Sequence, residues 1–289
     1  MKKSPLFSFY NVMVSISLLL MLGFSSCNKD DNTSTTGTAH LLTGNPSNAT
    51  QDVVTPENYL IDLPQYALSY NESRGIPNWV SWHLNLDWLG TVDRQDDFRD
   101  YADLPVDFYK VKSTDYSGSG FDRGHNCPSG DRTNTIEDNS ATFLMINMIP
   151  QAPDLNQETW RLLEEYCRKL VEQEGKELYI IMGNYGKGGT GNNGYKTTIA
   201  NGKVTVPTNV WKVIVVLDEG DNDLDRINTN TRVIAVDIPN KNSVNLSSWA
   251  QYRVSVDDIE QATGYNILSN ISTSLQNYVE ARVDDGPTQ

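Results

Sequence analysis

Residues 120–132 read GFDRGHNCPSGDR, and the interpretation of the whole chain depends on this stretch. It contains a carboxylate, Asp122, a histidine, His125, and two guanidinium groups, Arg123 and Arg132, between glycines and a proline that favour turns. Imidazole has an ordinary pKa of about 6.5, so much of it is neutral and basic at neutral pH. Guanidinium groups offer planar forks of donors that fit carboxylate or phosphate oxygens. The stretch is therefore the strongest candidate for a catalytic site.

A helix is expected from about Leu155 to Gln173. Asp154, with Gln157 three residues later, forms a capping pair that predicts its start, and Gly175 predicts its end. Residues four apart lie on one slowly drifting face of a helix. One such stripe holds Asn156, Trp160, Glu164 and Arg168, and the neighbouring, core-facing arc holds Leu163, Tyr166 and Leu170. The helix therefore offers an amide, a carboxylate and a guanidinium to one cleft, which the histidine can face.

The remaining elements predict the fold class. Strands are expected over residues 79–84, 141–148, 178–182, 211–217 and 232–237, and a second helix from Ser255 or Val256 to Ala262, ending at Gly264. Strands on both sides of a long helix, without regular alternation, favour an α+β fold with a largely antiparallel sheet.

The segment Asp122-Arg123-Gly124-His125 resembles the signature of the DNA/RNA nonspecific endonucleases of the ββα-metal superfamily. The resemblance covers about Asn78 to Gly264. Its other matching segments, in the family's order, are residues 93–99, 104–105, 147–151, 154–157, 160–168, 206–208, 211–213 and 252–254. It implies the ββα-metal fold, with a largely antiparallel central sheet flanked by helices. It also implies a sugar-nonspecific endonuclease that hydrolyses phosphodiester bonds in DNA and RNA and leaves 5′-phosphate ends.

The resemblance implies a role for each matching residue. His125 is the general base, Asn156 binds Mg²⁺ or Mn²⁺ directly, and Glu164 holds a metal-bound water. The expected catalytic residues are His125, Arg94, Arg123, Glu164 and Arg168; those expected to bind substrate are Arg94, Arg168 and Asn147. Asp122 is expected to orient backbone or an arginine, and Trp160 to pack rather than stack on a base.

Each residue also has a simpler explanation when taken alone. His125 fits a core histidine, Asn156 a helix N-cap, and Glu164 with Arg168 a surface ion pair. Their occurrence together, in the order one mechanism requires, favours the catalytic interpretation. The other two histidines, at positions 40 and 83, fall in an expected tether and an expected strand.

Other functions fit the sequence less well. Ser129 has no nucleophile-elbow sequence, and no histidines or cysteines occur at zinc-ligand spacing. The net charge of -14 argues against tight storage-type binding of nucleic acid, although an enzyme needs only a local cationic site. The alternative from another class is a surface lipoprotein that uses this fold to bind, with little or no catalysis.

The N-terminus predicts export. Lys2 and Lys3 precede a short apolar run, Val12 to Phe24, which ends in Ser25-Ser26-Cys27. This is typical of a lipoprotein signal, residues 1–27, in which Cys27 is lipidated and anchors the chain to the outer membrane, with exposure at the cell surface as one outcome. An ordinary secretory peptide is the alternative. Residues 28–55 are expected to be a flexible tether, and residues 56–289 one nuclease domain.

Two further cysteines, Cys127 and Cys167, leave two interpretations open. An exported protein allows them to form a disulfide that braces the site, and two buried thiols are the alternative.

Overall fold

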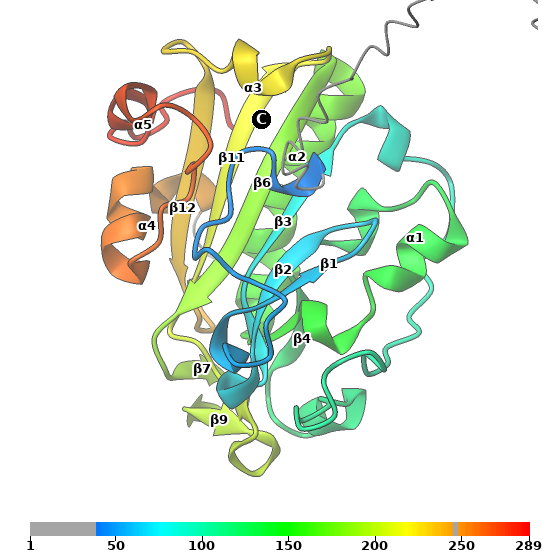
Figure 1. Cartoon of the computed structure of the whole chain (residues 1–289). Helices are drawn as coiled ribbons and strands as arrows, with labels where there is room; N and C mark the ends of the chain where they lie inside the picture. The colour runs from blue at the N-terminus through cyan, green and yellow to red at the C-terminus, as the bar shows by residue number, and fades with distance from the viewer. Residues whose placement is uncertain (1–38, 245–247) are drawn as a thin grey trace, which may run out of the picture. The chain divides into compact units, whose positions relative to one another are not determined.

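The computed structural model describes residues 39–244 and 248–289 and is built around a seven-stranded antiparallel sheet (Figure 1). Its strand order is β1-β2-β3-β6-β11-β12-β13. The strands are β1 Tyr59–Asp62, β2 Ala67–Asn71, β3 Ile76–Leu84, β6 Lys176–Tyr185, β11 Asn209–Asp218, β12 Arg232–Pro239 and β13 Arg253–Val254. The expected α+β class with a largely antiparallel sheet is confirmed.

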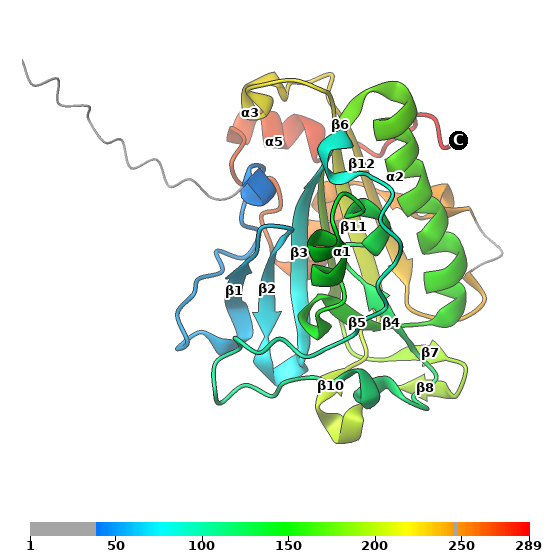
Figure 2. The same ribbon diagram turned by 90° about the vertical axis from the view of Figure 1, so that its right-hand side faces the viewer.

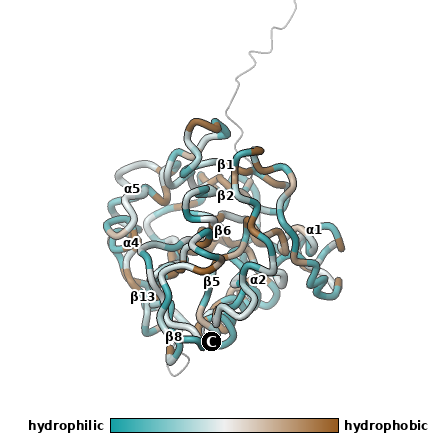
Figure 3. Tube along the Cα trace, turned by 90° about the horizontal axis from the view of Figure 1, so that it is seen from below, coloured by the Kyte–Doolittle hydropathy of each residue, from teal (hydrophilic) through white to brown (hydrophobic). Residues whose placement is uncertain are grey.

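The central strands are apolar on both faces because both faces of the sheet are covered. Side chains alternate between faces along a strand, so β6 supplies two cores. Leu178, Ile180 and Met182 pack into one core, and Tyr179 and Ile181 pack into the other. Figure 3 shows apolar stretches near the centre of the molecule and also in some outer loops, with hydrophilic stretches in much of the surrounding tube.

Each face of the sheet has its own cover. One core contains residues of the long helix α2 (Arg161–Glu174) and of β5 (Met148–Gln151), which pairs with β4 (Asp122–His125). The opposite core contains residues of α4 (Val256–Thr263) and α5 (Thr273–Val279). Figures 1 and 2 show α4 and α5 on the side of the sheet away from α2.

The shorter elements connect these layers. The helices are α1 Ile136–Ala141 and α3 Asp223–Arg226, and a π-helical segment, Leu155–Trp160, runs directly into α2. Two small hairpins pair β7 (Gly189–Gly191) with β8 (Gly194–Lys196) and β9 (Thr198–Ile199) with β10 (Val204–Thr205). The described short 3₁₀ helices are Ala39–Leu41, Pro56–Asn58, Glu72–Arg74, Leu86–Trp88, Ser113–Tyr116, Ser129–Asp131, Met145–Asn147, Ala200–Gly202 and Trp249–Tyr252.

Most of the predicted elements are confirmed, and one is wrong. The strands expected over 79–84, 178–182, 211–217 and 232–237 are β3, β6, β11 and β12, and the second helix is α4, capped by Ser255 and ended by Gly264 in the left-handed conformation. The strand expected over 141–148 is instead the end of α1, a turn and a 3₁₀ helix, and extended pairing begins only at Met148. Its apolar residues are buried in an irregular segment, which periodicity alone does not distinguish from a buried strand.

The expected tether is wrong for residues 39–49, most of which are buried or half-buried against the domain. Residues 50–55 are exposed, and the Leu60 N–H donates to the Thr50 carbonyl at 2.8 Å. His40, Leu41 and Ala49 are buried, and the ring of His40 lies 2.7 Å from the carbonyl oxygen of Pro64. Polar side chains here satisfy local backbone groups: the Asn45 amide donates to the Ala49 carbonyl and accepts from its N–H. The polar composition predicted a flexible tether, but these polar side chains form hydrogen bonds that hold the segment in place. Chain contacts group residues 37–289 as one compact unit.

Some expectations fall outside the described residues, among them the signal segment, Cys27 and residues 28–38. Within residues 39–244 and 248–289, no helix combines the length and apolar character needed to cross a bilayer. Cys127 and Cys167 are both buried and unpaired, which is the alternative with two thiols.

Candidate active site

His125 is the last residue of β4 and pairs with Met148 of β5, as expected for an extended segment that faces α2. Gly124 precedes it because a Cβ there would lie 2.2 Å from the Gln151 side chain. The imidazole is half-buried, with the Phe143 ring edge-on at 5.0 Å between centroids. Its Nε2 atom is enclosed and has no hydrogen-bond partner in the described structure.

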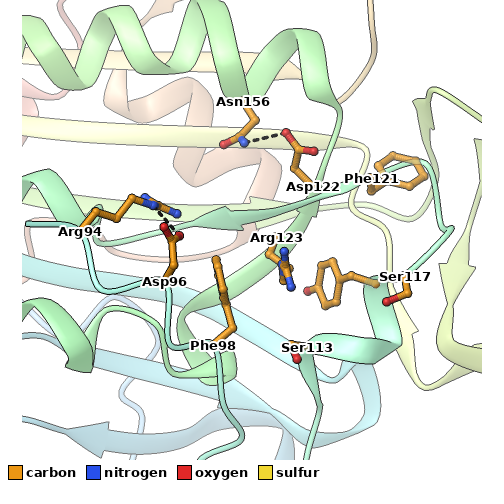
Figure 4. Close-up of a pocket in the computed structure, with 10 residues that line it drawn as sticks. Arg94, Asp96, Phe98, Ser113, Ser117, Phe121, Asp122, Arg123 and Asn156 are labelled. Carbon is orange, nitrogen blue, oxygen red and sulfur yellow. Dashed lines mark hydrogen bonds and ion pairs between the residues drawn. The ribbon is translucent and has the colours of Figure 1, made fainter.

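The predicted catalytic residues meet in one cleft of about 420 Å³ between β4 and the π-helix with α2. Its lining is Arg94, Arg123, His125, Pro128, Ser129, Gly130, Asn156, Gln157, Arg161, Glu164, Glu165 and Arg168. An adjoining hollow of about 300 Å³ shares Arg94, Arg123 and Asn156 with the cleft and adds Phe98 and Phe121 (Figure 4). The tertiary structure therefore brings together residues that lie up to 74 positions apart in the sequence.

Asn156 is held by Asp122 rather than by a helix cap. Its Nδ2 donates to Asp122 Oδ2 at 2.9 Å, and Gln157 Nε2 donates to the same oxygen at 2.8 Å. Figure 4 shows the Asn156 amide nitrogen pointing to Asp122 and its oxygen pointing away. Asp122 therefore orients two side-chain amides, and not the backbone or arginine that the sequence led us to expect.

The π-helix changes the predicted stripe. Trp160 is buried, as expected for packing, and Asn156 lies on the wider π-helical turn before it. The capping pair expected at Asp154 and Gln157 is absent: Asp154 Oδ2 accepts from the Ser243 backbone N–H at 2.8 Å, and Gln157 bonds to Asp122. The core-facing arc of Leu163, Tyr166 and Leu170 is buried as predicted.

Glu164 lies opposite a buried lysine that the sequence analysis missed. Lys212 of β11 is 1% exposed, and its Nζ lies 3.8 Å from Glu164 Oε1 and 4.6 Å from the centroid of the Trp160 ring. Burial raises the pKa of Glu164 to about 7, opposed by the charges of Lys212 and Arg168. Strand alternation was the available signal, because position 212 shares a face with the core residues Val210 and Ile214.

Asp131 holds Arg168 in the cleft. Arg168 NH1 lies 2.8 Å from Asp131 Oδ1, and Trp82 Nε1 donates to the other oxygen at 3.0 Å. Gly130 leaves room for the guanidinium, because a Cβ there would lie 2.9 Å from Arg168 NH1. Asp131 lies in the stretch 120–132, but nothing in its spacing along the sequence indicates this contact.

The other two arginines lie near the imidazole. Arg94 donates to Ser129 Oγ at 2.9 Å and to Asp96 Oδ1 at 2.7 Å, and the guanidinium of Arg123 lies 4.1 Å from the centroid of the Phe98 ring. Burial, with the charges of Arg94 and Arg123, lowers the pKa of His125 to about 3. The imidazole is therefore neutral throughout the range in which proteins usually work.

Asn147 is not a substrate contact, which corrects the expectation. It is fully buried, and its side chain bonds to the N–H and carbonyl of Cys127 and to the carbonyl of Thr142. It shapes the segment that follows His125 from beneath. Arg161, which the sequence analysis did not select, does line the cleft, where it pairs with Glu165 at 2.5 Å.

Comparison with known proteins gives this geometry a family. A sequence model described as DNA/RNA non-specific endonuclease matches residues 44–274. A protein named Nuclease from Nostoc sp. is 54% identical over 246 residues, covering 85% of this chain and 86% of its own. Nuclease C1 from Cunninghamella echinulata is 32% identical over 222 residues, covering 74% of this chain and 84% of its own.

A solved structure supports the fold. The EndoG/EndoGI complex contains a chain with a TM-score of 0.65 and 24% identity, covering 81% of this chain and 91% of that one. With the extent of the family match and the 54% identity to the Nostoc nuclease, these findings show that the chain belongs to the DNA/RNA non-specific endonuclease family and is an endonuclease.

Proposed function

We propose that the chain hydrolyses phosphodiester bonds of both DNA and RNA in a metal-dependent reaction and leaves 5′-phosphate ends. The observation that carries this proposal is the single cleft lined by His125, Asn156, Glu164 and three of the predicted arginines. The description of the matching family, DNA/RNA non-specific endonuclease, supports this substrate class.

His125 is the general base of the proposed reaction. A neutral imidazole has one nitrogen free to take a proton from the attacking water. We assign that role to Nδ1, because the nitrogen that takes the proton must reach the water and Nε2 is enclosed. The neutral ring then carries its own proton on Nε2. Attack is in line with departure of the 3′ oxygen, which leaves the phosphate on the 5′ side.

The residues of the cleft fit a hard divalent cation. The Asn156 oxygen accepts no hydrogen bond from the described residues, while its nitrogen is fixed on Asp122. Asn156 would hold Mg²⁺ or Mn²⁺ directly, and the Glu164 carboxylate would hold a water of the metal's shell. When bound, the cation supplies charge that stabilises the transition state and the departing oxygen.

The guanidinium groups bind the phosphate. Arg168 is held by Asp131 and Arg94 by Ser129 and Asp96, so both are positioned before substrate arrives. Arg123 is a third donor at the mouth of the cleft. Four arginines line this cleft, and Arg123 forms no ion pair with a described carboxylate, so guanidinium donors are available to phosphate on a chain whose net charge is -14. Contacts to phosphate carry little information on base sequence, and the phosphate group is the same in DNA and RNA. Such contacts therefore fit a nuclease that does not select the sugar.

The decisive experiment is digestion of plasmid DNA and of RNA with Mg²⁺, with Mn²⁺ and with a chelator, using the chain and its His125→Ala variant. We expect cleavage of both polymers to require the metal, and the variant to lose about 10²–10⁴-fold in rate, the usual contribution of a general base. Circular dichroism and the melting temperature serve as the folding control. A folded His125→Ala variant with full metal-dependent activity would falsify the mechanism.

We also propose that the chain is exported and held at the outer membrane by a lipid on Cys27, as the sequence of the N-terminal segment favours. Radiolabelled palmitate should label the wild-type chain, and a Cys27→Ser variant should be unlabelled and released into the soluble fraction. Equal fractionation of the two chains would contradict the anchor.

A further inference from the structure

Three carboxylates gather on the side of the sheet away from the catalytic cleft. Asp257 and Glu260 lie one turn apart on α4, so both project from the same side of the helix. Glu280 follows directly after α5. One oxygen of each residue lies within 4.8 Å of the others. The backbone connects the same parts, because the Asp257 N–H donates to the Glu280 carbonyl at 3.1 Å.

Glu280 is the unusual member of this acidic cluster, Asp257, Glu260 and Glu280. It is 4% exposed, and its Oε1 is enclosed without a hydrogen-bond partner in the described structure. Leaving a buried carboxylate oxygen unpartnered costs free energy unless a proton or a cation satisfies it. Burial and the two neighbouring carboxylates raise the pKa of Glu280 to about 7, opposed by a hydrogen bond from the Leu268 backbone to the carboxylate.

The acidic cluster has no basic partner within residues 39–244 and 248–289. None of its three carboxylates forms an ion pair with a described lysine, arginine or histidine. A second group of potential ligands, His83, Glu177 and Asp223, differs in this respect: Arg226 binds both of its carboxylates. Arg226 already neutralises that group, whereas no described lysine, arginine or histidine neutralises the acidic cluster.

We propose that the acidic cluster binds one calcium ion. The three carboxylate oxygens lie within 4.8 Å of one another, close enough for one calcium ion with bonds of about 2.4 Å to contact all three. Calcium accepts irregular sets of oxygens, whereas magnesium requires near-octahedral geometry at about 2.1 Å. Three carboxylates suit a dication, and waters complete its shell. The ion would connect the first turn of α4 to the end of α5 and satisfy the enclosed oxygen of Glu280.

This site is distinct from the proposed metal site at Asn156, so the experiment must separate the two. We therefore start from the full chain carrying Asn156→Ala, which weakens binding in the cleft. Into it we introduce either Glu280→Gln, which keeps the shape of the side chain, or Glu172→Gln, an exposed control on α2 that removes the same charge. Calcium chloride is titrated into each metal-free protein by calorimetry, and melting temperatures are measured with and without calcium.

We expect the Glu172→Gln control to bind one calcium ion and to gain about 5 °C in melting temperature at a calcium concentration about 100 times the dissociation constant. Glu280→Gln should bind at least about tenfold more weakly and gain little, while melting no lower than the control in the absence of calcium. The proposal is overturned if neither protein binds calcium, or if their affinities differ by less than about threefold. Nuclease activity does not enter these readouts, so the result is independent of the proposed function.

Discussion

Lys212 places a positive charge inside the core next to Glu164, and this pair decides the charge state of the cleft. A lysine this deeply buried is costly unless an opposite charge and aromatic faces compensate it. Both are present, because Glu164 lies 3.8 Å from its Nζ and the rings of Trp82 and Trp160 lie at 5.4 and 4.6 Å. Glu164 in turn depends on Lys212 to be ionised, since burial alone would keep it a neutral acid.

Replacing Lys212 with Met keeps the length and apolar body of the side chain and removes its charge. Glu164 ionises as pH rises through its pKa, about 7, and without Lys212 that pKa moves higher. The rising limb of the pH–rate profile should therefore move to higher pH. At pH 7 we expect kcat/KM to fall about tenfold for every pH unit by which this limb moves, with recovery near pH 9. The measurement is kcat/KM from pH 5 to 9.

The matched control is Lys169→Met, which removes a half-buried lysine one residue beyond Arg168 on α2. Its profile should match the wild type. If Lys212→Met also gives the wild-type profile, Lys212 does not set the ionisation of Glu164 in the active enzyme.

Motif and spacing predicted several residues that line the cleft but not the partners of their side chains. His125, Asn156 and Glu164 were predictable because the signature and the helix fix their order along the chain. Lys212 and Asp131 were not, because their roles depend on contacts across the sheet and between loops. Asn147 was misassigned for the same reason. It lies beside the segment that follows His125, but its side chain is buried in the core and bonds to the Cys127 backbone.

At the scale of elements, the junction between β4 and the π-helix positions Asn156. One Asp122 oxygen receives hydrogen bonds from both Asn156 and Gln157. This arrangement requires consecutive residues to reach the same carboxylate, and the wider π-helical turn provides the backbone for it. A regular α-helical stripe, as the sequence suggested, does not describe this turn.

Removing this contact should weaken metal binding more than catalysis at saturating metal. In an Asp122→Ala variant the Asn156 amide loses its orientation, and partners of this kind typically contribute 10–100-fold in metal affinity. We expect the Mg²⁺ concentration for half-maximal activity to rise by about that factor, with most of the rate restored at high Mg²⁺. Activity is measured across a Mg²⁺ titration.

Gln157→Ala is the control for this experiment, because it removes the second hydrogen bond to Asp122 and leaves the first in place. Its Mg²⁺ requirement should stay within about threefold of the wild type. An unchanged requirement in Asp122→Ala would show that the Asn156 amide keeps its orientation without Asp122.

Strands and the two longer helices were predictable because their apolar residues recur with a clear period. Both helices also end at a glycine, and α4 begins at a capping serine. The segment 141–148 was not, because every residue in it is buried and no period remains to separate strand from turn. The π-helix was not predictable for a related reason: over a single turn, the pattern of polar and apolar residues does not distinguish a π-helix from an α-helix.

At the scale of the whole molecule, the N-terminal segment 39–55 belongs to the folded unit. It contributes buried side chains, and several hydrogen bonds join it to distant parts of the chain. Ser81 Oγ donates to the His40 carbonyl, Trp79 Nε1 donates to Ser47 Oγ, and Asn270 Nδ2 donates to the Leu41 carbonyl. The segment therefore covers part of β3 and contacts the loop before α5.

A fragment that begins at Pro56 should be less stable than one that begins at Gly37. It loses the burial of Leu41, worth about 1.5–3 kcal/mol, and leaves the Ser81 and Trp79 donors without their acceptors. We expect its melting temperature to be lower by about 10 °C. Differential scanning calorimetry of the two fragments checks this, and equal melting temperatures would show that the segment adds no stability.

The fold class was predictable at this scale and the domain boundary was not. Antiparallel pairing follows from several separate strands around one long helix, whereas the boundary depends on which polar residues find partners. Asn45 and Ser47 look like linker residues until the structure shows their hydrogen bonds.

The two thiols of the described domain have a practical consequence. Burial raises the pKa of Cys127 and of Cys167 to about 12, so in the native state neither forms an appreciable thiolate. The folded enzyme therefore resists alkylating reagents, and each labelling event records a moment when the core has opened. Cys127 lies two residues after the end of β4 and Cys167 lies within α2, so mass spectrometry of the two labelled peptides would time the opening of each part separately.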